Sequence, residues 1–121
     1  MKKTVIVGAT TNSSRYAYLA AEMLHQYRHT FVPLGIKSGE VLGNPILDIS
    51  EKPKIGDVDT ITLYIGSRHQ PAWYDYLLGL KPKRIIFNPG TENPEFLIKA
   101  QEAGVEALEA CTLVMLRTGQ F

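Results

Sequence analysis

Cysteine is scarce in this sequence, in which Cys111 is the only one among 121 residues. A lone cysteine excludes an intrachain disulfide and any metal site built from several cysteines. No apolar stretch reaches the roughly 18 residues that a membrane-spanning helix needs. The apolar or small residues between Lys3 and Thr10 are also too few for the core of a signal peptide. We therefore expect the protein to be soluble and to work in a reducing compartment, the cytoplasm.

An excess of charge of either sign is also missing. Lys and Arg number 13 and Asp and Glu number 12, which leaves a formal net charge of +1. Such a balance gives no electrostatic reason to expect a nucleic acid or an acidic membrane as partner. The hydrophobic share of 45% and the charged share of 21% are those of an ordinary globular protein. With no internal repeat or low-complexity tract, the chain is expected to form one domain, residues 1–121.

Patterns typical of strands alternate with patterns typical of helices along the chain. Gly and Pro separate these segments, and residues 35–45 read as a loop, while residues 50–57 read as a connector that holds a helical turn. Strands are expected at residues 4–7, 30–34, 45–48, 60–65, 84–87 and 105–108, with Pro33 marking the end of the second. Helices are expected at residues 16–27, 71–80, 94–103 and 112–117.

This alternation predicts an α/β fold with right-handed crossovers. The expected architecture is Rossmann-like and doubly wound, a mainly parallel sheet of five to six strands with helices on both faces. Ligands of such sheets bind beyond the carboxyl ends of the strands, where the strand order reverses. The residues that follow Val7, Leu34, Ile65 and Phe87 are therefore the candidates for a binding site.

The first turn from strand to helix, residues 8–15, has the composition of a phosphate-binding loop. Gly8 permits a tight turn, Ser and Thr hydroxyls can donate, and Arg15 supplies a cation. The helix that follows presents free N–H groups and the positive end of its dipole. The other interpretation is a polar, well-capped turn without a ligand. The turn is not a dinucleotide fingerprint, because Thr10 and Ser13 stand where the second and third glycines belong.

The segment after the second strand carries a cation instead of an acid. Proteins that bind NAD usually place Asp or Glu there to bond the ribose hydroxyls. Here no acid occurs before Glu40, and Lys37 stands among small and apolar residues. A lysine at this point suits a phosphorylated ribose, as in NADP or coenzyme A (CoA). A solvated loop lysine is the alternative.

Several segments together resemble a known family. They read Val5-Ile6-Val7-Gly8-Ala9-Thr10, Ser14-Arg15, Val32-Pro33-Leu34-Gly35-Ile36-Lys37 and Glu40-Val41-Leu42-Gly43 and, along the third expected helix, Asn93-Pro94-Glu95-Phe96 and Ala100-Gln101-Glu102-Ala103-Gly104-Val105. In this order and spacing they resemble the small stand-alone CoA-binding domain proteins. Those proteins are relatives of the CoA-binding domain in the α subunit of succinyl-CoA synthetase and in NDP-forming acyl-CoA synthetases. The resemblance covers nearly the whole chain.

The resemblance implies a set of binding residues for CoA. The first turn would hold the diphosphate, the segment around Lys37 the phosphorylated nucleotide end, and the ends of the later strands the rest of the ligand. The implied residues are Gly8, Ala9, Thr10, Asn12, Ser14, Arg15, Pro33, Gly35, Lys37, Ile65, Gly66, Asn88 and Gly90.

Catalytic and metal-binding sets are not recognisable. His25 and His29 lack a matching third ligand, so no metal site is expected. His69 follows a strand end and reads either as a functional residue or as a polar loop residue. Cys111 reads as a small buried side chain, with a mixed disulfide to the CoA thiol as the alternative. No nucleophile, base and orienting group can be assembled.

These observations predict a protein that binds CoA or an acyl-CoA and has no complete catalytic set of its own. Two alternatives remain open. One is a redox sensor or oxidoreductase that binds NADP or NAD, which the fold alone supports. The other is the CoA-binding subunit of a multi-chain acyl-CoA ligase, with a partner chain supplying the rest. The protein partners that fit these interpretations are a second copy of the chain or such a ligase chain.

Overall fold

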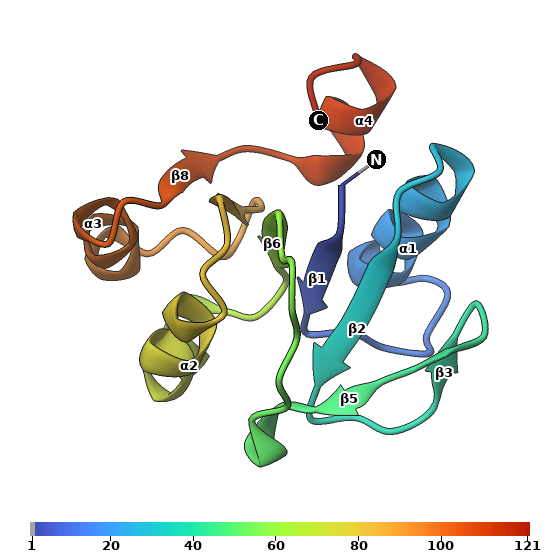
Figure 1. The fold of residues 1–121 in the computed structure, drawn as a ribbon. Helices are drawn as coiled ribbons and strands as arrows, with labels where there is room; N and C mark the ends of the chain where they lie inside the picture. The colour runs from blue at the N-terminus through green and yellow to red at the C-terminus, as the bar shows by residue number, and fades with distance from the viewer. Residues whose placement is uncertain (1) are drawn as a thin grey trace.

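The computed structural model describes residues 2–121 and contains a six-stranded sheet in which every pairing is parallel. The strand order is β5-β2-β1-β6-β7-β8. The strands are β1 (Thr4–Val7), β2 (Phe31–Gly35), β5 (Leu47–Asp48), β6 (Thr60–Leu63), β7 (Arg84–Phe87) and β8 (Glu106–Glu109). This arrangement confirms the predicted Rossmann-like parallel sheet (Figure 1).

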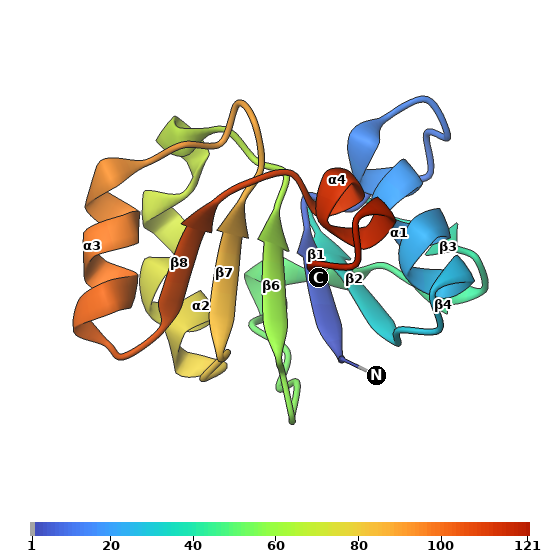
Figure 2. The same ribbon diagram turned by 90° about the horizontal axis from the view of Figure 1, so that it is seen from above.

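Helices cover both faces of the sheet (Figure 2). They are α1 (Tyr16–Gln26), α2 (Tyr74–Gly79), α3 (Pro94–Glu102) and α4 (Thr112–Arg117), with 3₁₀ turns η1 (Ile49–Glu51), η2 (Ser67–His69) and η3 (Pro71–Trp73). Successive strand side chains point to opposite faces. Val5 and Val7 therefore pack into the core beneath α2 and α3, whereas Ile6 packs against α1 and α4. No helix among residues 2–121 combines the length and apolar character needed to cross a membrane.

The bounds of α3 follow from local sequence signals. The Asn93 side chain accepts a hydrogen bond from the Phe96 N–H at 3.2 Å and so caps the helix, and Pro94 occupies its first turn. The chain leaves the helix at Gly104, whose φ of +80° is open to glycine at little steric cost. The predicted start and stop of this helix are confirmed.

The predicted loop over residues 35–45 contains a small hairpin. Strands β3 (Glu40–Val41) and β4 (Asn44–Pro45) pair antiparallel, so the single short strand expected at residues 45–48 is wrong and is split between β4 and β5. The hairpin turns through Leu42 and Gly43, both with positive φ, at +50° and +82°. Two-residue hairpin turns favour positive φ at both positions, but leucine rarely adopts it, which hid the turn from sequence patterns.

Pro33 lies within β2 and does not end it, contrary to expectation. It pairs with Ile6 in the register between β1 and β2. The Leu34 carbonyl accepts from the Gly8 N–H, so the alternate residue Pro33 turns its nitrogen away from β1. The Pro33 nitrogen therefore faces the β5 side of β2, where the pairing with β5 includes only Leu34 and Gly35. The missing N–H of proline therefore removes no ladder hydrogen bond.

Two predicted elements around β6 are also shorter than expected. The strand expected over residues 60–65 leaves the sheet after Leu63, although the Tyr64 N–H still donates to the Val7 carbonyl at 2.8 Å. The helix expected over residues 71–80 begins as the 3₁₀ turn η3, and α2 starts only at Tyr74. The chain between β6 and α2 therefore forms two tight turns at the edge of the sheet.

The strand order reverses between β1 and β6. From β1 the chain moves outward to β2 and β5, and it then returns to the other side of β1 to form β6, β7 and β8. Loops that follow β1 and β6 diverge at such a reversal and leave a crevice between them. The carboxyl ends of β1 and β6 are thus the place to look for a ligand site.

Candidate functional site

A cavity of about 1040 Å³ opens at this reversal point. Its lining comes from the loops that follow β1, β2, β5, β6 and β7, and from the start of α1. Most of the predicted binding residues lie on its wall, namely Gly8, Ala9, Thr10, Ser14, Arg15, Gly35, Lys37, Ile65, Gly66 and Gly90. The topology therefore brings residues from distant parts of the sequence to one site, large enough for a cofactor.

Close packing around Gly8 brings β1 and β6 together at the floor of this cavity. Gly8 has a φ of +93°, and a Cβ atom placed there would lie 2.9 Å from both the Ile65 Cγ2 atom and the Tyr64 carbonyl oxygen. The N–H groups of Gly8 and Ala9 donate to the Leu34 carbonyl at 2.9 and 3.2 Å. Those two amides are thus used within the protein, and Gly8 serves close approach of the backbone.

The rest of the first turn is organised by its own side chains. The Thr10 hydroxyl accepts from the Asn12 N–H at 3.1 Å, and the Asn12 carboxamide oxygen accepts from the Ser14 N–H and hydroxyl at 3.0 and 2.7 Å. Arg15 precedes α1 without a side-chain cap, and Tyr16 and Ala17 of the first helical turn line the cavity. The first N–H groups of a helix have no partner within the helix. The start of α1 is therefore the part of the turn that offers free N–H groups to the cavity.

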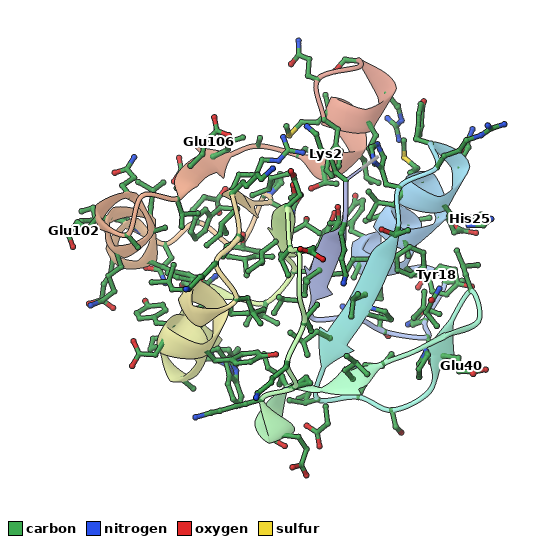
Figure 3. The ribbon with its side chains drawn as sticks, viewed as in Figure 1. Lys2, Tyr18, His25, Glu40, Glu102 and Glu106 are labelled. Atoms are coloured by element: carbon green, nitrogen blue, oxygen red, sulfur yellow. The ribbon has the colours of Figure 1, made fainter. Side chains whose placement is uncertain are left out.

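Cations dominate the charged groups of the cavity wall. Arg15, Lys37 and Arg68 line it and are exposed, whereas no Asp or Glu occurs among its lining residues. The dipole of α1 adds positive potential at the same place. Elsewhere in the structure, the carboxylates of Glu102 on α3 and Glu106 on β8 point outward from the fold (Figure 3). The site thus favours a ligand with several negative charges.

Apolar side chains form the other part of the wall, and most of them were not predicted from the sequence. Ile49, Trp73 and Tyr16 line the cavity together with Ile65 and the exposed Ile36. The one sequence feature that could have identified these residues is their position, because they follow the ends of β1, β2, β5 and β6. The ligand that fits this wall has an uncharged portion as well as anionic groups.

Three predicted residues do not line the cavity. Asn12 organises the first turn, and Pro33 is buried within β2. Asn88 is only 2% exposed and is bonded internally: its Nδ2 donates to the Thr62 hydroxyl at 2.7 Å and to the Leu63 carbonyl at 2.8 Å. Its Oδ1 accepts from the Thr112 N–H at 2.9 Å. The structure therefore gives Asn88 the role of joining β6, β7 and α4.

Tyr64 presents a neutral aromatic group to the cavity. Burial raises the pKa of Tyr64 to about 12, with hydrogen bonds of Thr62 and Thr112 acting in the opposite direction. A phenol with this pKa stays protonated near neutral pH. Tyr64 therefore adds no negative charge to the cationic site.

The remaining candidates for chemistry do not meet at one place. His25 points outward from α1 (Figure 3), whereas the His29 Nδ1 atom accepts from the Lys2 N–H at 3.0 Å. His69 lines the cavity and is exposed; Cys111 is half-buried next to α4 and does not line the cavity. Within residues 2–121 there is no group of three or more His, Cys, Asp or Glu side chains that could hold a metal ion.

Solved structures share this fold. One crystal structure, of a protein described only as uncharacterized, is 55% identical, with a TM-score of 0.97 over 100% of this chain and 98% of that one. Cell-free ID.343 from Thermus thermophilus is 19% identical, with a TM-score of 0.83 over 99% of this chain and 90% of that one. The dinucleotide-forming acetyl-coenzyme A synthetase 1 of Ca. Korarchaeum cryptofilum is 19% identical, with a TM-score of 0.69 over 90% of this chain and 25% of that one. No curated protein matches the chain.

The family model described as "CoA binding domain" matches residues 2–117. The matched range includes every residue that lines the cavity. It confirms the resemblance predicted from the segments around Gly8 and Lys37. By this match over nearly its whole length, the chain belongs to the CoA binding domain family.

Proposed function

We propose that this protein binds CoA or an acyl-CoA in the cavity at the reversal point of the sheet. The observation that carries the proposal is the cavity wall, where three cations and a helix start lie beside apolar side chains, with no carboxylate among them. CoA carries a diphosphate, a ribose phosphate and a long uncharged arm. The family to which the chain belongs supports the same ligand.

The diphosphate is assigned to the start of α1. Its first N–H groups and the helix dipole favour an anion there. Arg15 lies at the same point and can make charge-assisted hydrogen bonds with phosphate oxygens. Asn12 and Ser14 hold this turn in shape, which reduces the entropy lost on binding.

The ribose phosphate is assigned to Lys37. This exposed lysine lines the cavity just beyond β2, next to Gly35 and Ile36. A lysine suits a phosphate, whereas the free ribose hydroxyls of NAD are usually bonded by an acid at the end of the second strand. The absence of such an acid from the cavity wall favours CoA over NAD.

Titration calorimetry with CoA, 3′-dephospho-CoA, NAD and NADP tests the proposal. We expect the protein to bind CoA, and Lys37→Ala to weaken CoA by about 10- to 100-fold, the scale of one charge-assisted bond. The same variant should weaken 3′-dephospho-CoA by less than about twofold. Arg15→Ala should weaken both CoA compounds alike. Lys99→Ala is the control, because Lys99 is exposed on α3 and lies outside the cavity.

Other outcomes would overturn the proposal. If Lys37→Ala lowered the affinity for the two CoA compounds equally, Lys37 would not be the residue that binds the ribose phosphate. Binding of NADP or NAD without binding of CoA would favour a redox function. No binding of any of the four compounds would refute a CoA site formed by this chain alone.

A further inference from the structure

Gln70 is a fully buried polar residue that joins two loops of the cavity wall. It lies between η2 and η3 and has 0% of its surface exposed. Its Nε2 donates to the Ile65 carbonyl at 3.0 Å and to the Thr91 carbonyl at 2.8 Å. Residues 64–73 are called the β6 loop and residues 88–93 the β7 loop. The Gln70 side chain therefore links the β6 loop to the β7 loop.

In the part of the chain that the structure describes, no backbone-to-backbone hydrogen bond joins the two loops. The ladder between β6 and β7 ends at the pair Leu63 and Phe87. Beyond it, the backbone hydrogen bonds of the two loops go elsewhere: the Trp73 N–H donates to the Gln70 carbonyl, the Thr91 N–H to the Asn88 carbonyl and the Tyr64 N–H to the Val7 carbonyl. Gln70 thus continues the connection between the two chain segments where the sheet has stopped.

The orientation of the Gln70 carboxamide is determined on both sides. Its Oε1 accepts from Asn93 Nδ2 at 2.9 Å, and the same Nδ2 donates to the Tyr74 hydroxyl at 2.8 Å. The Tyr74 hydroxyl also contacts Glu95 Oε1 at 2.9 Å. Because both the Nε2 and the Oε1 atoms of Gln70 have partners, replacing Gln70 leaves the Ile65 and Thr91 carbonyls without this donor, which is unfavourable at a buried position.

Both carbonyls that Gln70 holds belong to residues of the cavity wall. Ile65 and Thr91 line the cavity, as do their neighbours Gly66 and Gly90, whereas Gln70 itself does not. Both loops lie at the same end of the sheet (Figure 2). Gln70 therefore acts from behind the wall and sets the spacing of its two sides.

We infer that Gln70 is a positioning residue that sets the affinity of the site for the uncharged, amide-bearing arm of CoA. The inference rests on the proposed function. Arg15 and Lys37 attract the phosphates, whereas Ile65, Gly66 and Gly90 offer an uncharged surface for the arm. A spacing fixed by Gln70 lets both loops contact the arm at once, which favours binding through preorganisation.

The test compares Gln70→Met, which keeps the length of the side chain and removes its hydrogen bonds, with Gln101→Met on the exposed side of α3. Amide hydrogen exchange reports on the two loops without any ligand. Calorimetry compares CoA with adenosine 3′,5′-bisphosphate, which lacks the arm. In Gln70→Met we expect exchange in both loops to rise about tenfold and CoA affinity to fall about tenfold, the scale of one or two lost hydrogen bonds. Affinity for the bisphosphate and all values for Gln101→Met should stay unchanged.

Three results would overturn the inference: unchanged loop exchange, unchanged CoA affinity despite faster exchange, or equal losses for CoA and the bisphosphate. A wild-type protein that binds no CoA refutes the proposed function and, with it, the role toward the arm; the exchange data then still decide whether Gln70 holds the loops. If Gln70→Met does not fold, exchange of the wild type with and without CoA replaces it. Protection that rises in both loops supports the inference, and protection confined to the first turn refutes it.

Discussion

Two glycines of the cavity wall have nearly the same positive φ and differ in their surroundings. Gly8 has a φ of +93° and Gly90 a φ of +92°. A Cβ at Gly8 would lie 2.9 Å from the Tyr64 carbonyl oxygen, which belongs to the backbone, and from the Ile65 Cγ2 atom, whereas nothing lies within 4 Å of a Cβ at Gly90. Substituting each with alanine separates the strain of positive φ from the effect of the contact.

We expect Gly8→Ala to destabilise the protein clearly more than Gly90→Ala. Positive φ disfavours both alanines by about 1–2 kcal/mol. The reduced freedom of the unfolded chain offsets about 0.4–1 kcal/mol of this in both variants. Only Gly8→Ala also forces β1 and β6 apart, and overpacking of this kind is unfavourable by about 1–3 kcal/mol. The difference between the variants is thus about 1–3 kcal/mol, because the other terms cancel.

Urea and thermal unfolding measure this difference. For a chain of this length, about 1 kcal/mol corresponds to about 4 °C in Tm. Gly8→Ala should therefore unfold about 4–12 °C below Gly90→Ala. Equal Tm values would show that β1 and β6 do not depend on close approach at Gly8, and would refute the account of how the floor of the cavity is built.

Asn88→Ala should lower the free energy of unfolding by about 2–4 kcal/mol, because it leaves the Thr112 N–H and the Leu63 carbonyl unpaired. CoA affinity of the folded variant should stay within about twofold in calorimetry; a small loss of stability with a large loss of affinity would instead place Asn88 at the ligand. In ultraviolet titration, the ionisation with a pKa of about 12 should vanish in Tyr64→Phe. Unfolded tyrosine ionises near pH 10, so as pH rises from 10 to 12 the unfolded chain loses this proton first and the wild type loses stability relative to Tyr64→Phe; parallel stability curves would contradict the buried phenol.

The sequence predicts the fold well where local signals are strong. The β-branched run of β1 and the apolar run of β7 appear with the expected bounds, as does α4. The hairpin of β3 and β4 was missed because Leu42 adopts the positive φ that usually marks glycine or asparagine. Strands of two residues also show no periodicity. These misses concern elements that tertiary packing selects over local preference.

The sequence predicts the site less completely than the fold. Glycines and cations after strand ends were found because the topology alone places them at one edge of the sheet. Asn88 follows a strand in the same way, yet its side chain turns inward to Thr62, and no pattern distinguishes that orientation. Ile49 reaches the cavity from the 3₁₀ turn after β5, and Trp73 reaches it from the second 3₁₀ turn after β6. Sequence patterns do not show where such turns place a side chain.

The reversal of strand order also shapes how the protein comes apart. The sheet consists of a half with β1, β2 and β5 and a half with β6, β7 and β8. Within the sheet the two halves pair through β1 and β6, from Thr4 with Thr60 to Val7 with Leu63. Pairings between such distant parts of a chain form slowly. The cavity takes residues from both halves. A ligand bound there would therefore contact both halves and stabilise their pairing. A bound ligand would therefore chiefly lower the rate of unfolding, and the lifetime of the native protein would depend on whether the site is occupied.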